Sequence, residues 1–205
     1  APENTLGGFQ YIHDLGIRAV EFDVRQLKDH ELIIMHDDNM LRTTGIDQAL
    51  YPLSSTQLDS YNQAHIWLDW EKQSTPTLRQ ALQIMQDFEH LEVEVKAVQT
   101  QAEAERLTQH LTQQLRGFEH SAVITSFDLK ILQALQDQHS TFKRGLLIED
   151  DIQQLAIEQA LKYDCCQIGW MNQLASDDLL KATQQANLAI SVWTVNDIER
   201  AKHLR

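Results

Sequence analysis

The chain has 205 residues with 42% hydrophobic content, which is enough for one α/β domain with a packed core and argues against disorder. Its 30 acidic residues against 17 basic residues give a net charge of −13, which disfavours nucleic-acid partners and anionic membrane surfaces. No apolar run approaches the roughly 20 residues of a membrane-spanning helix, and the two adjacent cysteines, Cys165 and Cys166, favour a reducing, cytoplasmic location.

Short apolar runs alternate with longer amphipathic ones along most of the chain. The short runs predict strands over residues 19–24, 32–35, 91–96, 122–126, 145–148, 165–168 and 188–195. Apolar residues at helical spacing predict helices over residues 3–15, 78–88, 101–116, 129–138, 152–162, 177–185 and 197–204. This alternation is typical of a mostly parallel sheet with helices outside it. We therefore predict one α/β domain over residues 1–205, a distorted TIM-type (β/α)8 barrel with an antiparallel hairpin near its N-terminus.

The first two strands are predicted to form that hairpin. The polar segment between them is centred on Asp29 and His30, and a hairpin folded about this pair places Asp23 opposite His36. A one-residue shift in register would turn His36 to the other face of the sheet.

Residues 41–74 interrupt the regular alternation of strand and helix. They contain Pro52, Trp67 and Trp70 but no long periodic segment. We expect a small insertion with a short helix, lying over one end of the barrel.

Two carboxylates on the first strand are the first candidate for chemistry. Glu21 and Asp23 are two residues apart within an apolar run, so their side chains share one face. Buried carboxylates need a positive partner, and a hard divalent cation is a suitable one. The alternative is that the pair forms the solvated face of an edge hairpin. His36 would supply a proton-transfer group beside a metal site.

A second acidic strand strengthens the metal hypothesis. Glu92, Glu94 and Lys96 share one face of the strand predicted over residues 91–96. Glu94 lies near the carboxyl end of this strand, the working end in α/β barrels, and could complete an oxygen set with Glu21 and Asp23. Lys96 offers a positive charge to a phosphate oxygen. The alternative is a Glu–Lys pair that neutralises itself inside the barrel.

Residues at other strand ends have two interpretations each. Ser126 could touch a substrate, whereas Asp128 could simply cap the following helix. Trp193 could line the pocket or belong to the core, and Asn196 is expected to cap the last helix. Arg42 could contact a phosphate or lie on the surface.

The chain resembles the glycerophosphodiester phosphodiesterases, which belong to the group of phosphatidylinositol-phospholipase-C-like barrels. The resemblance is carried, in order along the chain, by Ala1–Thr5, Glu21–Val24, Lys28–Asp29, His36–Asp37, Arg42–Thr44, Pro76–Leu78, Glu94–Lys96, Ser126–Asp128 and Trp193–Asn196. It implies one divalent cation, Ca²⁺ or Mg²⁺, held by Glu21, Asp23 and Glu94. It also implies a general acid/base role for His36 and phosphate binding by Lys96, with Glu3 and Asn4 shaping the site beside the metal.

The function implied is hydrolysis of small glycerophosphodiesters to an alcohol and glycerol 3-phosphate. The resemblance departs at both ends, because the family places a His–Arg pair before the position of Ala1 and a closing strand after that of Arg205. We therefore expect a trimmed barrel without its first and closing segments, and an isolated 205-residue piece with little or no activity. Two alternatives are a non-catalytic, metal-dependent binding module of the same fold and a phosphodiesterase that cleaves lysophospholipids.

Overall fold

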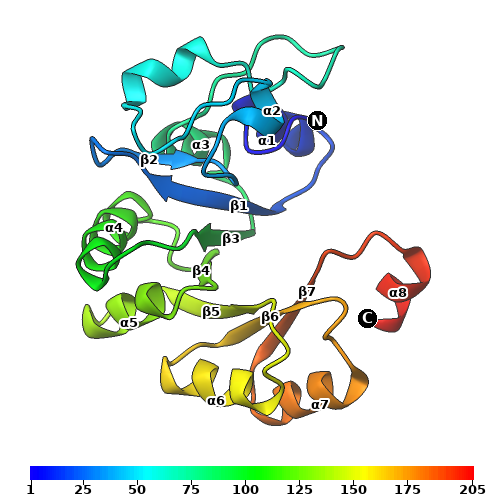
Figure 1. Cartoon of the computed structure of the whole chain (residues 1–205). Helices are drawn as coiled ribbons and strands as arrows, with labels where there is room; N and C mark the ends of the chain where they lie inside the picture. The colour runs from blue at the N-terminus through cyan, green and yellow to red at the C-terminus, as the bar shows by residue number, and fades with distance from the viewer.

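The computed structural model describes residues 1–205, in which seven strands form one curved sheet with the order β2-β1-β3-β4-β5-β6-β7. The strands are β1 (Ala19–Gln26), β2 (Leu32–Ile34), β3 (His90–Val95), β4 (Ala122–Ser126), β5 (Lys143–Ile148), β6 (Gln167–Met171) and β7 (Ala189–Trp193). Only β2 is antiparallel to its neighbour, and the other pairs are parallel. The sheet curves as in a barrel but does not close, because β2 and β7 do not pair with each other (Figure 1).

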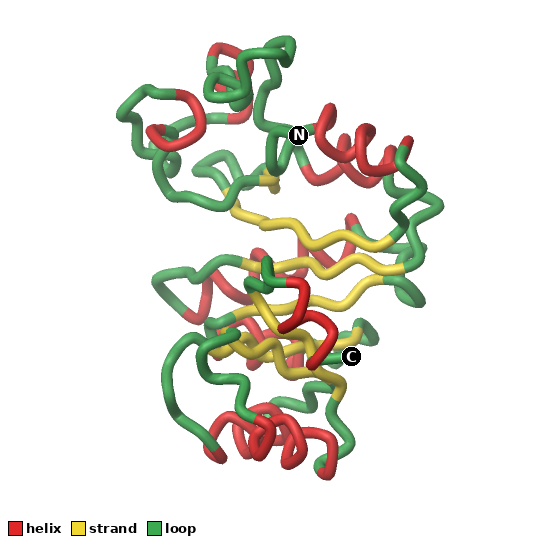
Figure 2. The backbone as a smooth tube through the Cα atoms, turned by 90° about the vertical axis from the view of Figure 1, so that its right-hand side faces the viewer, coloured by secondary structure: helices red, strands yellow, loops and turns green.

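The helices follow the strands and lie mainly along the outer side of the sheet (Figures 1 and 2). They are α1 (Leu6–Asp14), α2 (Leu41–Thr44), the 3₁₀ helix η1 (Ser55–Ser60), α3 (Leu78–Ile84), α4 (Gln101–Gln114), α5 (Leu129–Asp137), α6 (Gln154–Lys162), α7 (Asp177–Gln185) and α8 (Ile198–His203). None of these helices combines the length and the apolar composition needed to cross a bilayer.

The two faces of the central strands carry different side chains. Phe22 and Val24 of β1 belong to the largest core cluster, together with residues of β3 and of the helices outside the sheet. Since side chains alternate along a strand, Glu21, Asp23 and Arg25 occupy the opposite, inner face. The inner faces of distant strands approach each other, because the Ser191 hydroxyl of β7 lies 3.5 Å from Glu92 Oε1 of β3. The helices thus pack the outside of the sheet, and the polar residues face its concave side.

Polar caps fix where several helices begin. Thr77 caps α3 and forms a capping box with Gln80, and Pro76 precedes this cap. The predicted capping role of Asp128 at α5 is confirmed, because its side chain accepts the backbone N–H of Lys130. The cap of α8 is Asp197, so the prediction of Asn196 as this cap was wrong by one residue.

The predicted hairpin register was also wrong by one residue. Val24 pairs with Ile34, and the Met35 N–H donates to the Asp23 carbonyl, so Met35 and not His36 lies opposite Asp23. The connecting loop has three residues, Lys28 to His30, because Leu27 N–H donates to the Glu31 carbonyl. His30 adopts a left-handed conformation with φ 65°, as is common at the end of such loops.

The segment 41–74 packs against the hairpin through its own small core. Ile33 and Met35 of the hairpin belong to one buried cluster with Leu50, Leu53 and Leu58 of the segment. This packing anchors a segment with little regular structure beside the end of β2 (Figure 1).

Candidate active site

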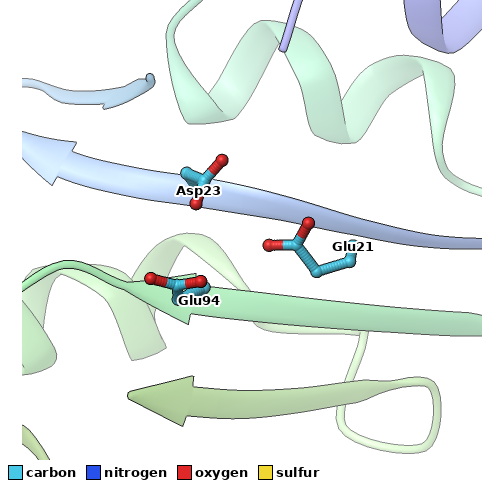
Figure 3. A group of neighbouring side chains, drawn as sticks. All are labelled: Glu21, Asp23 and Glu94. Atoms are coloured by element: carbon cyan, nitrogen blue, oxygen red, sulfur yellow. The ribbon is translucent and has the colours of Figure 1, made fainter. Parts of the chain in front are cut away.

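Three carboxylates from two neighbouring strands converge on the inner side of the sheet. Asp23 of β1 and Glu94 of β3 are directly in register, and Glu21 lies two residues before Asp23 on the same face of β1. One oxygen from each of the three side chains lies within 4.8 Å of the others, and Figure 3 shows the Glu21 carboxylate between the strands that carry Asp23 and Glu94. The predicted grouping of Glu21, Asp23 and Glu94 is thus present in the structure.

Lys96 and Asn4 hold this cluster from two sides. The Lys96 ammonium lies 2.6 Å from Asp23 Oδ1 and also hydrogen-bonds to Glu94. Asn4 Nδ2 donates to Asp23 Oδ2 at 2.7 Å, and the Asp23 N–H donates to Asn4 Oδ1 at 3.3 Å. Asn4 adopts a left-handed conformation with φ 53°, which asparagine tolerates better than most residues. Both residues therefore orient Asp23.

The electrostatics show a shortage of positive charge in the cluster. The Glu21 side chain is partly exposed on the open concave side of the sheet. The surrounding protein still desolvates its carboxylate, and this desolvation, together with repulsion from Asp23 and Glu94, raises the pKa of Glu21 to about 8. Burial raises the pKa of Glu94 above its usual value although Lys96 opposes the shift. Burial lowers the pKa of Lys96, but Asp23 and Glu94 outweigh it and raise that pKa, so the ammonium stays charged. One ammonium does not neutralise three carboxylates.

This donor set fits a hard divalent cation. All three candidate ligands are carboxylate oxygens, which Ca²⁺ and Mg²⁺ prefer. With Lys96 counted, the ionised cluster retains an excess of negative charge that a divalent cation would neutralise. Glu21, Asp23 and Glu94 could therefore hold such an ion.

A chain of side-chain contacts runs from Glu3 through Arg42 and Asp37 to His36 and holds His36 in place. His36 Nδ1 lies 2.6 Å from Asp37 Oδ1, and Arg42 Nε donates to Asp37 Oδ2 at 2.7 Å. Arg42 Nη1 in turn donates to Glu3 Oε2 at 2.9 Å. Burial raises the pKa of Asp37, but the hydrogen bonds from Arg42 and His36 outweigh it and bring that pKa below its usual value. Because the ionised Asp37 accepts, Nδ1 of His36 carries the proton and Nε2 is left for proton transfer.

Arg25 supports the same histidine through the backbone. Its Nε and Nη2 atoms donate to the His36 carbonyl at 3.0 and 2.6 Å, and Nη1 donates to the Tyr51 hydroxyl at 2.9 Å. In the sequence, Asp37 was identified within a motif but given no role, and Arg25 and Tyr51 were missed. The period of two on β1 could have indicated Arg25, which shares a face with Glu21 and Asp23, whereas Tyr51 lies in a segment without periodicity.

The other candidate residues lie at different distances from the cluster. Glu92 lies nearer the amino end of β3, where its Oε2 is 3.8 Å from His90 Nε2. Ser126 is fully buried and donates to the Val95 carbonyl, so it does not face a substrate. Trp193 packs edge-on against Phe127 and donates from Nε1 to the Gly169 carbonyl at 3.2 Å. Its predicted place in the pocket wall stays a prediction, as do the substrate-binding roles of Glu3 and Asn4.

A surface hollow of about 730 Å³ is unrelated to this cluster. It lies between α4 and the segment that follows α5, and its lining includes none of the carboxylates, Lys96 or His36. A smaller cavity of about 450 Å³ borders the cluster, because Lys96 and Arg25 line it. The smaller cavity touches the cluster through Lys96, and its lining includes neither the three carboxylates nor His36.

Comparison with known proteins gives both the class, a phosphoric diester hydrolase, and the family. The model of the glycerophosphoryl diester phosphodiesterase family matches residues 1–205, so the chain belongs to this family.

The chain is also similar to individual proteins over nearly its whole length. An uncharacterized protein of Mycoplasma genitalium is 27% identical over 96% of this chain and 82% of its own length. A glycerophosphodiester phosphodiesterase of Caldanaerobacter subterraneus is 23% identical over 97% of this chain and 84% of its own. The structure of an Oleispira antarctica phosphodiesterase in complex with the product sn-glycerol-3-phosphate superposes with a TM-score of 0.88 at 22% identity, covering 100% of this chain and 83% of that one. At this identity the structural likeness shows a shared fold.

Proposed function

We propose that this protein hydrolyses glycerophosphodiesters to an alcohol and glycerol 3-phosphate, with a divalent cation held by Glu21, Asp23 and Glu94. The observation that carries the proposal is the convergence of these carboxylates with Lys96 on the inner side of adjacent parallel strands. Glu94 and Lys96 lie at the carboxyl end of β3, the end where barrel enzymes place their chemistry. The bound cation would neutralise charge on the phosphoryl oxygens. The family and the product named in the Oleispira structure support this substrate class.

The residues of the chain have separate tasks in this scheme. Lys96 carries a buried positive charge beside Asp23 and Glu94, and it offers this charge to a phosphate oxygen. His36 exchanges a proton at Nε2 with the nucleophile or with the leaving alcohol, while its Nδ1–H donates to Asp37. Arg42, which also donates to Glu3, holds Asp37 in place and thereby orients the imidazole. Trp193 would line the far wall of the pocket.

The segment 41–74 is proposed to be an insertion of this single domain that covers the edge of the active site. Two of its residues support this role, because Arg42 contacts Asp37 and Glu3, and Tyr51 accepts a hydrogen bond from Arg25. The insertion would therefore hold the His36 side chain through Asp37 and the His36 carbonyl through Arg25.

Release of glycerol 3-phosphate from sn-glycero-3-phosphocholine by the protein expressed from its full gene tests the proposal. We expect turnover that depends on added Ca²⁺ or Mg²⁺, and a loss of about 10²–10⁴-fold in rate for His36→Gln. His120→Gln is the matched control, because His120 is exposed and has no hydrogen-bond or ion-pair partner. Cation binding without hydrolysis of any glycerophosphodiester would contradict the enzyme and favour a binding module of the same fold.

A further inference from the structure

The inner faces of β1 and β3 carry the same order of charges. Each strand has two carboxylates followed by a basic residue at its carboxyl end, Glu21, Asp23 and Arg25 on β1 and Glu92, Glu94 and Lys96 along β3. The Lys96 N–H donates to the Val24 carbonyl, so Lys96 lies beside the step from Val24 to Arg25. On both strands the carboxylates of the inner face are therefore followed by a positive charge at the carboxyl end.

The two basic residues at these strand ends, Arg25 and Lys96, also line the cavity of about 450 Å³. The cavity lies between the end of the β1–β2 hairpin and the first turns of α4, and its size suits a small ligand. Its lining includes four basic side chains from separate elements, Arg25, Lys28, Lys96 and Arg106. Glu103 is the single carboxylate in the lining, and its Oε2 already accepts the N–H groups of Gln99 and Thr100.

Three of these basic side chains have no acidic partner within the protein. Lys28 and Arg106 form no ion pair and no side-chain hydrogen bond, and Arg25 donates only to the His36 carbonyl and the Tyr51 hydroxyl, which are neutral. This arrangement contrasts with the net charge of −13 of the whole chain. Because Lys96 lines the cavity and also contacts Asp23 and Glu94, the cavity adjoins the carboxylate cluster, and one extended substrate could reach both.

We propose that this basic cavity binds a second phosphate group carried by the leaving alcohol. The inference rests on the proposed function and adds to it a substrate class, glycerophosphodiesters whose alcohol bears a further phosphate or phosphodiester. Guanidinium groups such as those of Arg25 and Arg106 match the planar, multi-oxygen face of a phosphate. An alcohol with a positive charge, such as choline, meets unneutralised cations in the same cavity and is disfavoured there.

The test compares two substrates with the protein expressed from its full gene. The anionic substrate is 1,3-bis(sn-glycero-3-phospho)glycerol, in which the leaving alcohol carries a second phosphodiester, and the reference is sn-glycero-3-phosphocholine. We expect kcat/KM to favour the anionic substrate by at least about tenfold, the lower end of what a charged cleft contributes. The double variant Lys28→Gln/Arg106→Gln should reduce this ratio about tenfold.

The matched control is Arg116→Gln/Lys143→Gln, which removes the same two charges from exposed positions outside the cavity. This control should leave the ratio unchanged. A ratio near one in the wild type, or an equal ratio in the wild type and the Lys28→Gln/Arg106→Gln variant, would overturn the inference while leaving the phosphodiesterase proposal intact.

If neither substrate is hydrolysed, the proposed function fails and calorimetric binding decides the inference separately. In that case 1,3-bis(sn-glycero-3-phospho)glycerol should still bind, at least about tenfold more weakly to Lys28→Gln/Arg106→Gln than to the wild type and the control. Equal binding to all three proteins, or binding to none, would reject the cavity as a phosphate site.

Discussion

The Lys96 ammonium lies 2.6 Å from Asp23 Oδ1, across the join between two parallel strands. It also hydrogen-bonds to Glu94, its neighbour two residues earlier on the same face. Lys96 is therefore the internal counter-charge for two buried carboxylates. Its removal should affect both the stability of the protein and its affinity for cations.

Lys96→Gln should lower the free energy of unfolding by on the order of 3 kcal/mol in the absence of divalent cations, because it leaves two buried carboxylates unpaired. Calcium should then raise the unfolding midpoint of the variant more than that of the wild type, since ligands that bind the native state stabilise it. Chemical denaturation with and without calcium measures both effects. Lys130→Gln is the control, because Lys130 pairs with Asp128 nearer the surface and should contribute less than about 1 kcal/mol. Equal losses in the two variants would contradict the account.

Asp37→Asn should show the pH dependence of the contacts that orient His36. The pKa of Asp37 is lowered in the folded state, so its stabilising contribution is present above the unfolded-state pKa of about 3.9. It is lost as the pH falls through the lower folded-state pKa. The difference in unfolding temperature between wild type and variant should therefore be constant above about pH 5 and shrink towards pH 3.

Asp151→Asn provides the comparison for this experiment, because Asp151 is exposed and makes no side-chain hydrogen bond. It should differ little from the wild type at any pH. An Asp37→Asn difference that grows on acidification would show that Asp37 is destabilising when ionised, opposite to the geometry described here.

Asn4 should matter both for its hydrogen bonds and for its backbone conformation. Asn4→Gly removes two hydrogen bonds to the buried Asp23 and should cost about 1–3 kcal/mol in urea unfolding. Asn4→Ala adds the penalty of a left-handed backbone and should be less stable than the glycine variant by about 1 kcal/mol. An alanine variant as stable as the wild type would remove Asn4 from the support of the site.

Much of the fold could be predicted from local patterns. The apolar runs and the helical spacing identified every strand and most helices, because burial on one or both faces leaves a periodic trace in the sequence. The hairpin register could not be predicted, since it depends on whether the turn has two or three residues. The left-handed conformation of His30 decides that choice.

The site could be predicted only in part for a similar reason. Glu21 and Asp23 share a strand face with period two, and Glu94 lies on the adjacent parallel strand, so topology brings them together. The bond between Arg42 and Glu3 joins residues 39 positions apart that lie outside the sheet, and no local pattern predicts it.

The most direct test of the account is calorimetric titration of Ca²⁺ and Mg²⁺ into the wild type, Glu94→Gln and Glu92→Gln. Glu92 is the matched control, because it occupies the same face of β3 but lies outside the group of three converging carboxylates. Loss of residues that merely support metal ligands commonly weakens binding about 10–100-fold, so Glu94→Gln should weaken it at least about tenfold. Glu92→Gln should bind like the wild type. Equal cation affinity in all three proteins would contradict the proposal that Glu21, Asp23 and Glu94 form one metal site.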